Sequence, residues 1–321
     1  MLRQPIGWIT LAPLLLGMVA SRGLPAAGDE PPQGRCQLWV DVYRGEPLAY
    51  PDVLADLAGA RVLYLGERHG VARIHRWQAR IVADLARKGV PLALALEQIE
   101  AHQQPVVDRY NRGEIGFEEL TRAIDWARRW PGYEDYRPAI EAARRAGAPI
   151  LALNARQETV RQVARSGGVA NLPPEARAEL PADMDLDDPP YERVLGRPLQ
   201  VHMAATPERL RPMVEAQIAR DETMAERLAA FLKSEAGKSR MAVVLVGAGH
   251  VSYGLGLPER VRRRMPETRD RIVVFSESGE GELTPGMEAV SRPVMITHED
   301  LRAIGRPIAD YLQVAGRPDT P

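Results

Sequence analysis

Two short apolar runs, each followed by the motif Gly-x-x-His, constrain the fold of this chain more than any other feature. The first motif occupies residues 66–69 and ends at His69, and the second occupies residues 247–250 and ends at His250. Apolar runs of this length that are rich in Val and Leu are typical of buried parallel strands. Each histidine therefore lies just past the carboxyl end of a predicted strand, which is the edge at which open α/β sheets bind ligands.

Predicted strands and helices alternate along the rest of the chain. Short apolar runs predict strands at residues 61–66, 91–96, 149–153, 241–246 and 271–275. Apolar residues three or four positions apart predict helices at residues 51–57, 71–88, 105–127, 136–146 and 214–231. This alternation is typical of the α/β class with a mainly parallel central sheet. Residues 167–212 are rich in proline and lack periodicity, which indicates a helical or irregular insertion.

Length and composition limit the classes of function. From a total of 321 residues, we expect residues 50–321 to form a single α/β domain that carries the insertion. The formal net charge is −1, and aromatic residues make up 5% of the chain. A balanced charge and few aromatic side chains argue against nucleic acid as a partner.

The N-terminal residues are predicted to direct export rather than to join the fold. Arg3 precedes an apolar segment at residues 6–20, and small residues follow at 26 and 27. This pattern predicts a signal peptide over residues 1–27 and a periplasmic or secreted protein, with an uncleaved membrane anchor as the alternative. Residues 28–49 are predicted to be a leader into the domain. The single cysteine, Cys36, does not lie in a lipobox.

Polar side chains follow the carboxyl ends of four predicted strands. His69 and His250 follow two of them, Glu97 follows a third, and Asn154 follows a fourth, with Arg156 two positions later. Because parallel strands end at one edge of a sheet, we expect these side chains to lie close together. Neutral imidazole and carboxylate together suit zinc, iron or manganese, so a metal site formed by His69, Glu97 and His250 is predicted.

Haem is the other cofactor that these residue types could hold. A haem iron takes an imidazole or a phenolate as axial ligand, and arginine can meet the propionates. Tyr133 and Tyr136 lie in a cluster of aromatic and cationic residues that could wall a flat anionic ligand. Structural roles stay open as well, because a single histidine after a strand is usually hydrogen-bonded in place. Glu97 could act as a helix N-terminal charge, and Glu67 could cap the helix that follows it.

The order and spacing of these motifs resemble the ChaN-like haem-binding uptake proteins, within the wider Tiki/TraB and erythromycin-esterase-like superfamily. The resemblance spans roughly residues 50 to 275. The segments that carry it are residues 65–69, His75, and residues 94–97, 136–138, 151–156, 217–225 and 246–251.

The resemblance implies a three-layer α/β/α fold and a bacterial envelope protein for haem or iron uptake. Its partners would be haem, a second copy of the chain around the haem, and an outer-membrane haem receptor system. The residues expected to bind the cofactor are His69, His250, Tyr133, Tyr136, Arg156 and Asn154, with the axial ligand open between tyrosine and histidine. The absence of a lipobox departs from the lipoprotein members of the family.

The alternative function is that of a metal-dependent hydrolase of the protease or esterase type. Relatives in the superfamily that act in this way use two Gly-x-x-His motifs and a glutamate, which correspond to His69, His250 and Glu97. A bound metal would lower the pKa of a coordinated water, and Glu67 or Glu97 would act as the general base. The residues leave open which of the two functions the chain has.

Overall fold

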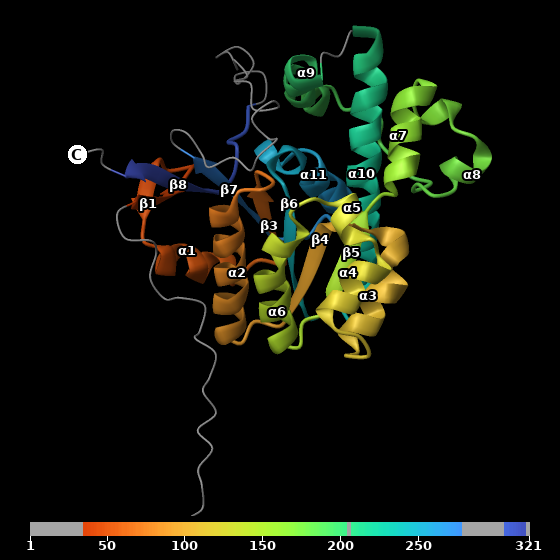
Figure 1. Ribbon diagram of the computed structural model, residues 1–321. Coiled ribbons are helices and arrows are strands. Elements are labelled where there is room, and N and C mark those ends of the chain that lie inside the picture. Colours follow the sequence, from red (N-terminus) through yellow and green to blue (C-terminus); the bar gives the residue numbers. More distant parts are fainter. Residues whose placement is uncertain (1–34, 204–206, 278–304, 319–321) are drawn as a thin grey trace, which may run out of the picture. The chain divides into compact units, whose positions relative to one another are not determined.

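The central element is one mixed sheet, whose strands are spread from β1 at the left to β5 at the right of Figure 1. The structure is a computed structural model that describes residues 35–203, 207–277 and 305–318. Within these residues the sheet has eight strands in the order β2-β1-β8-β7-β3-β6-β4-β5. Their bounds are β1 (Arg35–Asp41), β2 (Glu46–Leu48), β3 (Val62–Glu67), β4 (Leu92–Glu100), β5 (Ile150–Asn154), β6 (Met241–Gly247), β7 (Asp270–Glu277) and β8 (Tyr311–Pro318).

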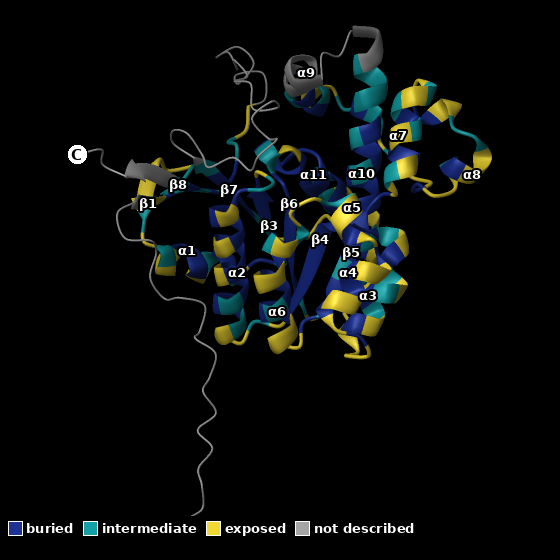
Figure 2. Cartoon of the chain, viewed as in Figure 1, coloured by how far each residue is buried: buried dark blue, intermediate teal, exposed yellow. Residues whose placement is uncertain are grey.

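All neighbouring strands from β8 to β5 run parallel, and only β1 is antiparallel to its two neighbours. The predicted α/β class with a mainly parallel sheet is therefore confirmed. Every residue of β3, β4 and β6 is buried, as the dark blue strands of Figure 2 show. Burial on both faces explains why these strands are nearly continuous apolar runs in the sequence.

Helices cover both faces of the sheet, which makes three layers. Leu63 and Leu65 of β3 pack in one core with α1, α2, α3, α4 and α6, whereas Val62 and Tyr64 pack in the opposite core with α10 and α11. This alternation follows from the two-residue period of a strand. The helices are α1 (Tyr50–Leu57), α2 (Ala72–Arg87), α3 (Gln104–Asn111), α4 (Phe117–Ala123), α5 (Trp126–Arg129), α6 (Arg137–Arg145), α7 (Gln157–Ser166), α8 (Pro174–Arg177), α9 (Pro189–Met203), α10 (Pro207–Lys233) and α11 (Leu257–Arg264).

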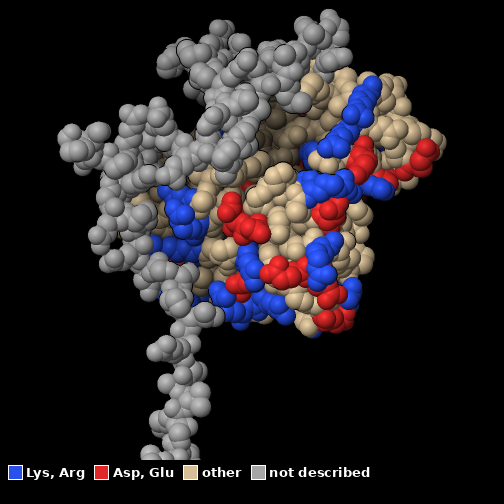
Figure 3. All heavy atoms as spheres, in the orientation of Figure 1, with Lys and Arg blue, Asp and Glu red and all other residues tan. Residues whose placement is uncertain are grey.

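Helix α2 illustrates why these segments fold as they do. Its buried residues include Ile74, Ile81 and Leu85, which are seven and four positions apart and so lie on one apolar face. The helix ends where Gly89 takes a φ of +76°, a conformation that glycine adopts without steric cost. On the face shown in Figure 3, charged side chains of both signs are interspersed, and exposed pairs such as Arg137–Glu141 contribute little to stability.

The structure also differs from the predictions in several places. Residues 28–49 contain β1 and β2, so from Arg35 onward they belong to the sheet rather than to a leader. β8 and α7 were not predicted, and residues 105–127 form three short helices instead of one interrupted helix. The insertion at residues 167–212 holds α8, α9 and the first turn of α10. The signal peptide predicted at residues 1–27 lies outside the described residues.

The described residues, from Arg35 onward, group into one compact unit. None of the helices that the structure describes combines the length and the apolar character needed to cross a bilayer.

Candidate functional site

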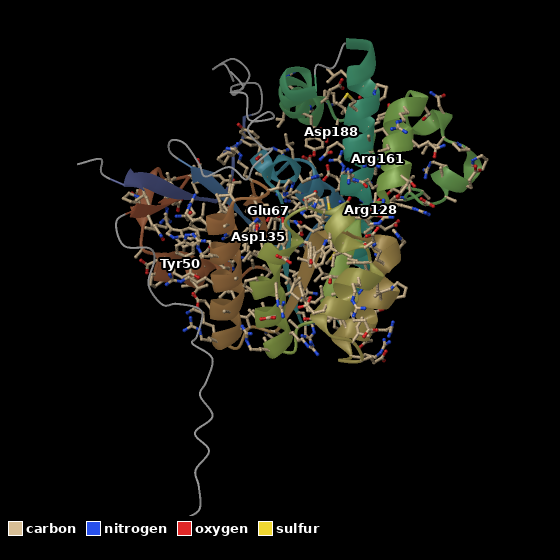
Figure 4. All side chains as sticks on the ribbon, viewed as in Figure 1. Tyr50, Glu67, Arg128, Asp135, Arg161 and Asp188 are labelled. Atoms are coloured by element: carbon tan, nitrogen blue, oxygen red, sulfur yellow. The ribbon has the colours of Figure 1, made fainter. Side chains whose placement is uncertain are left out.

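The candidate site lies at the carboxyl edge of three adjacent strands, β3, β6 and β4. Glu67 ends β3 and pairs in register with Gly247, the last residue of β6. Glu97 lies in β4, on the other side of β6. His250 lies in the short helix η4 (Ala248–His250), which directly follows β6. Figure 4 shows Glu67 at the upper end of the sheet, with Arg161 and Asp188 lying still higher in the view. Parallel pairing therefore brings both Gly-x-x-His motifs together, as predicted.

The first histidine is held by a buried carboxylate. His69 Nδ1 lies 2.8 Å from Glu67 Oε1, and the Tyr136 hydroxyl donates a hydrogen bond to the same oxygen. Gln78 Nε2 donates to Glu67 Oε2 at 2.6 Å, and Gln98 Nε2 donates to Oε1 at 3.3 Å. Burial alone would raise the pKa of Glu67, but the hydrogen bonds and the nearby imidazoles together hold it below its usual value. Glu67 is thus ionised, both of its oxygens accept hydrogen bonds, and one of them contacts the ring of His69.

The second histidine has a matching arrangement built from other elements. His250 Nδ1 lies 2.6 Å from Asp221 Oδ1, and the Tyr191 hydroxyl donates to Asp221 Oδ2 at 2.6 Å. Asp221 comes from α10 and Tyr191 from α9, in the insertion. Burial would lower the pKa of His250, but the charges of Asp221 and Glu97 raise it to about 10. His250 is therefore an imidazolium at neutral pH.

Glu97 lies between the two histidines. Its Oε1 is 3.2 Å from His250 Nε2, and its Oε2 accepts a hydrogen bond from the Gly247 amide at 2.6 Å. Although burial opposes ionisation, the charge and hydrogen bond of His250 hold the pKa of Glu97 well below its usual range. A Cβ atom at Gly247 would lie 3.0 Å from His69 Nε2, so any larger residue there would push the imidazole away by a few tenths of an ångström. We call Glu67, His69, Glu97, Asp221 and His250 the acid–imidazole cluster.

Only one member of the acid–imidazole cluster reaches solvent to a large extent. The side chain of His69 is 40% exposed, whereas those of His250, Glu97 and Glu67 are 7%, 4% and 0% exposed. The ring of His69 packs edge-to-face against Trp130, with 5.0 Å between the ring centroids. Burial would lower the pKa of His69, but Glu67 and Glu97 raise it. The cluster thus has one accessible imidazole, that of His69, and the buried carboxylate of Glu67 orients it.

The three residues predicted as metal ligands, His69, Glu97 and His250, do lie together. Among the residues that the structure describes, however, no group of three or more His, Cys, Asp or Glu side chains is arranged to hold a metal ion. Both ring nitrogens of His250 lie against carboxylates, so a protonated ring has no lone pair for a metal. A metal role for these residues stays a prediction.

Of the other predicted site residues, Tyr136 contacts the acid–imidazole cluster, whereas Tyr133, Asn154 and Arg156 contact other residues. Tyr136 is buried and contacts Glu67, whereas the Tyr133 hydroxyl contacts the neighbouring Glu134. Asn154 is buried and accepts a hydrogen bond from Arg220. Arg156 is exposed and pairs with Glu179 at 2.9 Å and with Glu158 at 3.5 Å.

Several residues of the site could not be assigned from the strand ends. Asp221 and Gln217 lie one turn apart on α10, and both contact His250. Their i, i+4 spacing was the sequence feature that could have indicated a shared role. Tyr191 lies in a proline-rich stretch with no periodic pattern, so its role depended on tertiary packing. A cavity of about 800 Å³ is lined by Asp188, Tyr253 and Arg260, beside α11 rather than at His69.

Comparison with known proteins identifies a matching family and similar solved structures. A family described as "Haem-binding uptake, Tiki superfamily, ChaN" matches residues 53–261. The solved structure titled "Cofacial heme binding to ChaN of Campylobacter jejuni" is similar with a TM-score of 0.63 and 18% identity, over 88% of this chain and 97% of that one. A mutant of the erythromycin esterase EreC in its open conformation gives a TM-score of 0.45 and 14% identity, over 81% and 83% of the two chains.

Among curated proteins, the chloroplastic protein RETICULATA-RELATED 5 of Arabidopsis thaliana is 24% identical over 259 residues, which are 72% of this chain. The match spans 34%, or about a third, of the plant protein's length. The family match covers well over half of this chain and includes both Gly-x-x-His motifs. The chain belongs to the ChaN-like haem-binding uptake family of the Tiki superfamily.

Proposed function

We propose that this protein binds haem at the acid–imidazole cluster and serves haem or iron uptake in the bacterial cell envelope. Membership of the haem-binding uptake family supports this proposal, as does the fold shared with Campylobacter jejuni ChaN, a protein described as binding haem cofacially. The observation that carries the proposal is the exposed imidazole of His69, held on one side by Glu67 and bordered by Trp130.

The residues present fit a haem at this edge of the sheet. A haem site needs an accessible axial ligand, an apolar or aromatic wall and cations for the propionates. His69 and Trp130 supply the first two. Arg156 is 46% exposed, and its pairs with exposed glutamates are worth only about 0–1 kcal/mol, so a propionate can replace a glutamate at little cost.

His69 is the better axial ligand of the two histidines. His250 is buried, and both of its ring nitrogens lie against carboxylates. Tyr136 is also unsuited, since burial and the adjacent Glu67 raise its pKa well above the usual value and disfavour the phenolate. The half-buried Tyr133 is the competing ligand, although burial and the adjacent Glu134 raise its pKa as well. Haem bound here would supply redox-active iron, and the chain would hold and orient it.

Location and partners belong to the same proposal. The apolar segment at residues 6–20 supports export to the periplasm or beyond. An exposed axial ligand leaves one haem face open, which a second copy of the chain could cover. An outer-membrane haem receptor would then be the source of the haem.

Titration of the purified protein with haemin tests the proposal. We expect a saturable Soret shift that is lost in His69→Ala. His102→Ala is the matched control, because the His102 side chain is 45% exposed and also lies near a glutamate, Glu100. A wild-type protein without saturable haemin binding refutes the proposal, and equal binding by His69→Ala refutes the choice of ligand.

One observation favours hydrolysis as a second candidate function. An imidazole oriented by a carboxylate through Nδ1 is the arrangement of a general base, and His69–Glu67 has this form. The low pKa of Glu67 and of Glu97 makes either carboxylate a weak base, so His69 would take that role. A p-nitrophenyl ester assay that finds turnover lost in His69→Ala and kept in His102→Ala supports this candidate, and no turnover by the wild type rejects it for activated esters.

A further inference from the structure

We propose a second binding site, for a small amphipathic anion, in a groove along the free edge of β5. The groove has a volume of about 630 Å³ and is bounded by α3 and α10, which both contact β5. Figure 1 shows β5 at the α3 side of the sheet. Sites for small organic ligands have volumes of about 300–1,000 Å³, so the groove is large enough for a ligand of this class.

The side chains of α3 explain why the groove exists. Asn111 donates to the Ile150 carbonyl and accepts from the Ile150 amide, both at 2.9 Å. Gln104 Oε1 accepts from the Ala152 amide at 2.7 Å. These contacts satisfy the edge of β5 and close it to a further strand, which excludes an extended peptide as the ligand. The space beside the edge is left uncovered.

The groove carries an excess of positive charge. Four arginines line it, Arg112, Arg144, Arg227 and Arg240, against one acid, Asp108. Arg112 is paired with a glutamate outside the groove, but among the described residues no ion pair is found for the other three. Concentrated charge of one sign in a concave surface attracts ligands of the opposite sign.

Two of these cations are placed by contacts that leave their charge uncompensated. The Arg144 guanidinium lies over the ring of Tyr110, 4.7 Å from its centroid. Arg240 Nη1 donates to the Leu92 carbonyl at 2.9 Å, which fixes it without a carboxylate. The ligand must therefore supply the negative group, and guanidinium suits carboxylate or phosphate oxygens.

Part of the groove lining is apolar, which favours a ligand with an apolar body. Leu151 of β5 and Phe231 of α10 are only partly buried and lie on the groove. An apolar chain or ring laid on them would be removed from water, worth about 25 cal/mol per Å² of surface buried. The ligand class is therefore a carboxylate or phosphate monoester with an apolar body. None of the acid–imidazole cluster lines the groove.

Calorimetric titration of the full chain with decanoate and with decyl phosphate, both below micelle-forming concentrations, tests the proposal. Decanol measures binding of the apolar chain alone, and inorganic phosphate measures binding of the anionic group alone. We expect about one saturable site for at least one of the two anionic probes, and weaker or no binding of decanol and phosphate. The double variant Arg144→Glu/Arg227→Glu should weaken the anion at least about tenfold, which corresponds to 1.4 kcal/mol.

The matched control is Arg76→Glu/Arg122→Glu, which changes the charge equally at exposed arginines on α2 and α4. It should bind the probe as the wild type does. Haemin titration of Arg144→Glu/Arg227→Glu should be unchanged, which separates this site from the proposed haem site. Absence of saturable binding by both anionic probes, equal binding by the groove variant, or loss of haemin binding in that variant overturns the proposal.

Discussion

Replacing Asp221 with asparagine should strongly reduce the pH dependence that His250 gives to stability. In the folded protein Asp221 and Glu97 raise the pKa of His250 to about 10, against a value of 6.5 for free histidine. A difference of this size corresponds to about 5 kcal/mol of preference for the charged ring, at 1.36 kcal/mol per pH unit. The side chain is 7% exposed, so solvent screening reduces this figure little.

The sign follows from proton binding. Between pH 6.5 and about 10 the folded protein keeps a proton on His250 that the unfolded chain has lost. The contribution of His250 to the free energy of unfolding should therefore be complete below pH 6.5 and fall by about 1.4 kcal/mol per pH unit up to about pH 10. In Asp221→Asn the main charge that raises this pKa is gone, burial disfavours the imidazolium, and the slope should become much shallower.

Urea unfolding at pH 6, 7, 8 and 9 measures the slope directly. Asp187→Asn is the matched control, because Asp187 is an exposed aspartate of the insertion and no effect on the slope is expected. Long-range ¹H–¹⁵N spectra of His250 report the ring's protonation independently of stability. Parallel stability profiles for the wild type and Asp221→Asn would refute the reasoning.

Three further substitutions test other parts of the structure. Tyr136→Phe removes a donor from buried Glu67 and should cost about 1–3 kcal/mol in urea unfolding. The control Tyr133→Phe removes only an exposed hydrogen bond to Glu134 and should change stability by less than about 0.5 kcal/mol. Gly247→Ala should weaken haemin binding by displacing His69, while Gly249→Ala, whose Cβ meets no atom within 4 Å, should not; equal affinities would contradict this role of Gly247. Asn111→Leu should expose the edge of β5 and increase self-association in light scattering. Scattering equal to that of the wild type would contradict a protective role of Asn111 and leave Gln104 as the residue that protects the edge.

The parts of the fold that sequence reasoning could predict are those with a local pattern. The five predicted strands all exist within a few residues of their expected bounds, because strands buried on both faces are continuous apolar runs. β1 and β8 were missed, since their pairing joins residues near 38 to residues near 314 and leaves no short-range signal. α7 was missed as well, although its buried residues Val160 and Val163 stand three positions apart.

The sequence by itself determined that His69 and His250 would share one edge, because glycine-terminated apolar runs make parallel strands, and parallel strands end together. It also determined that an acid, Glu97, would end near them. Tertiary structure alone decided which histidine is accessible and how far the pKa of each is raised. The protonation of His250 depends on Asp221 and Tyr191, which come from helices in distant parts of the chain. The burial of these polar groups sets the strength of their charges, and no apolar pattern in the sequence marks it.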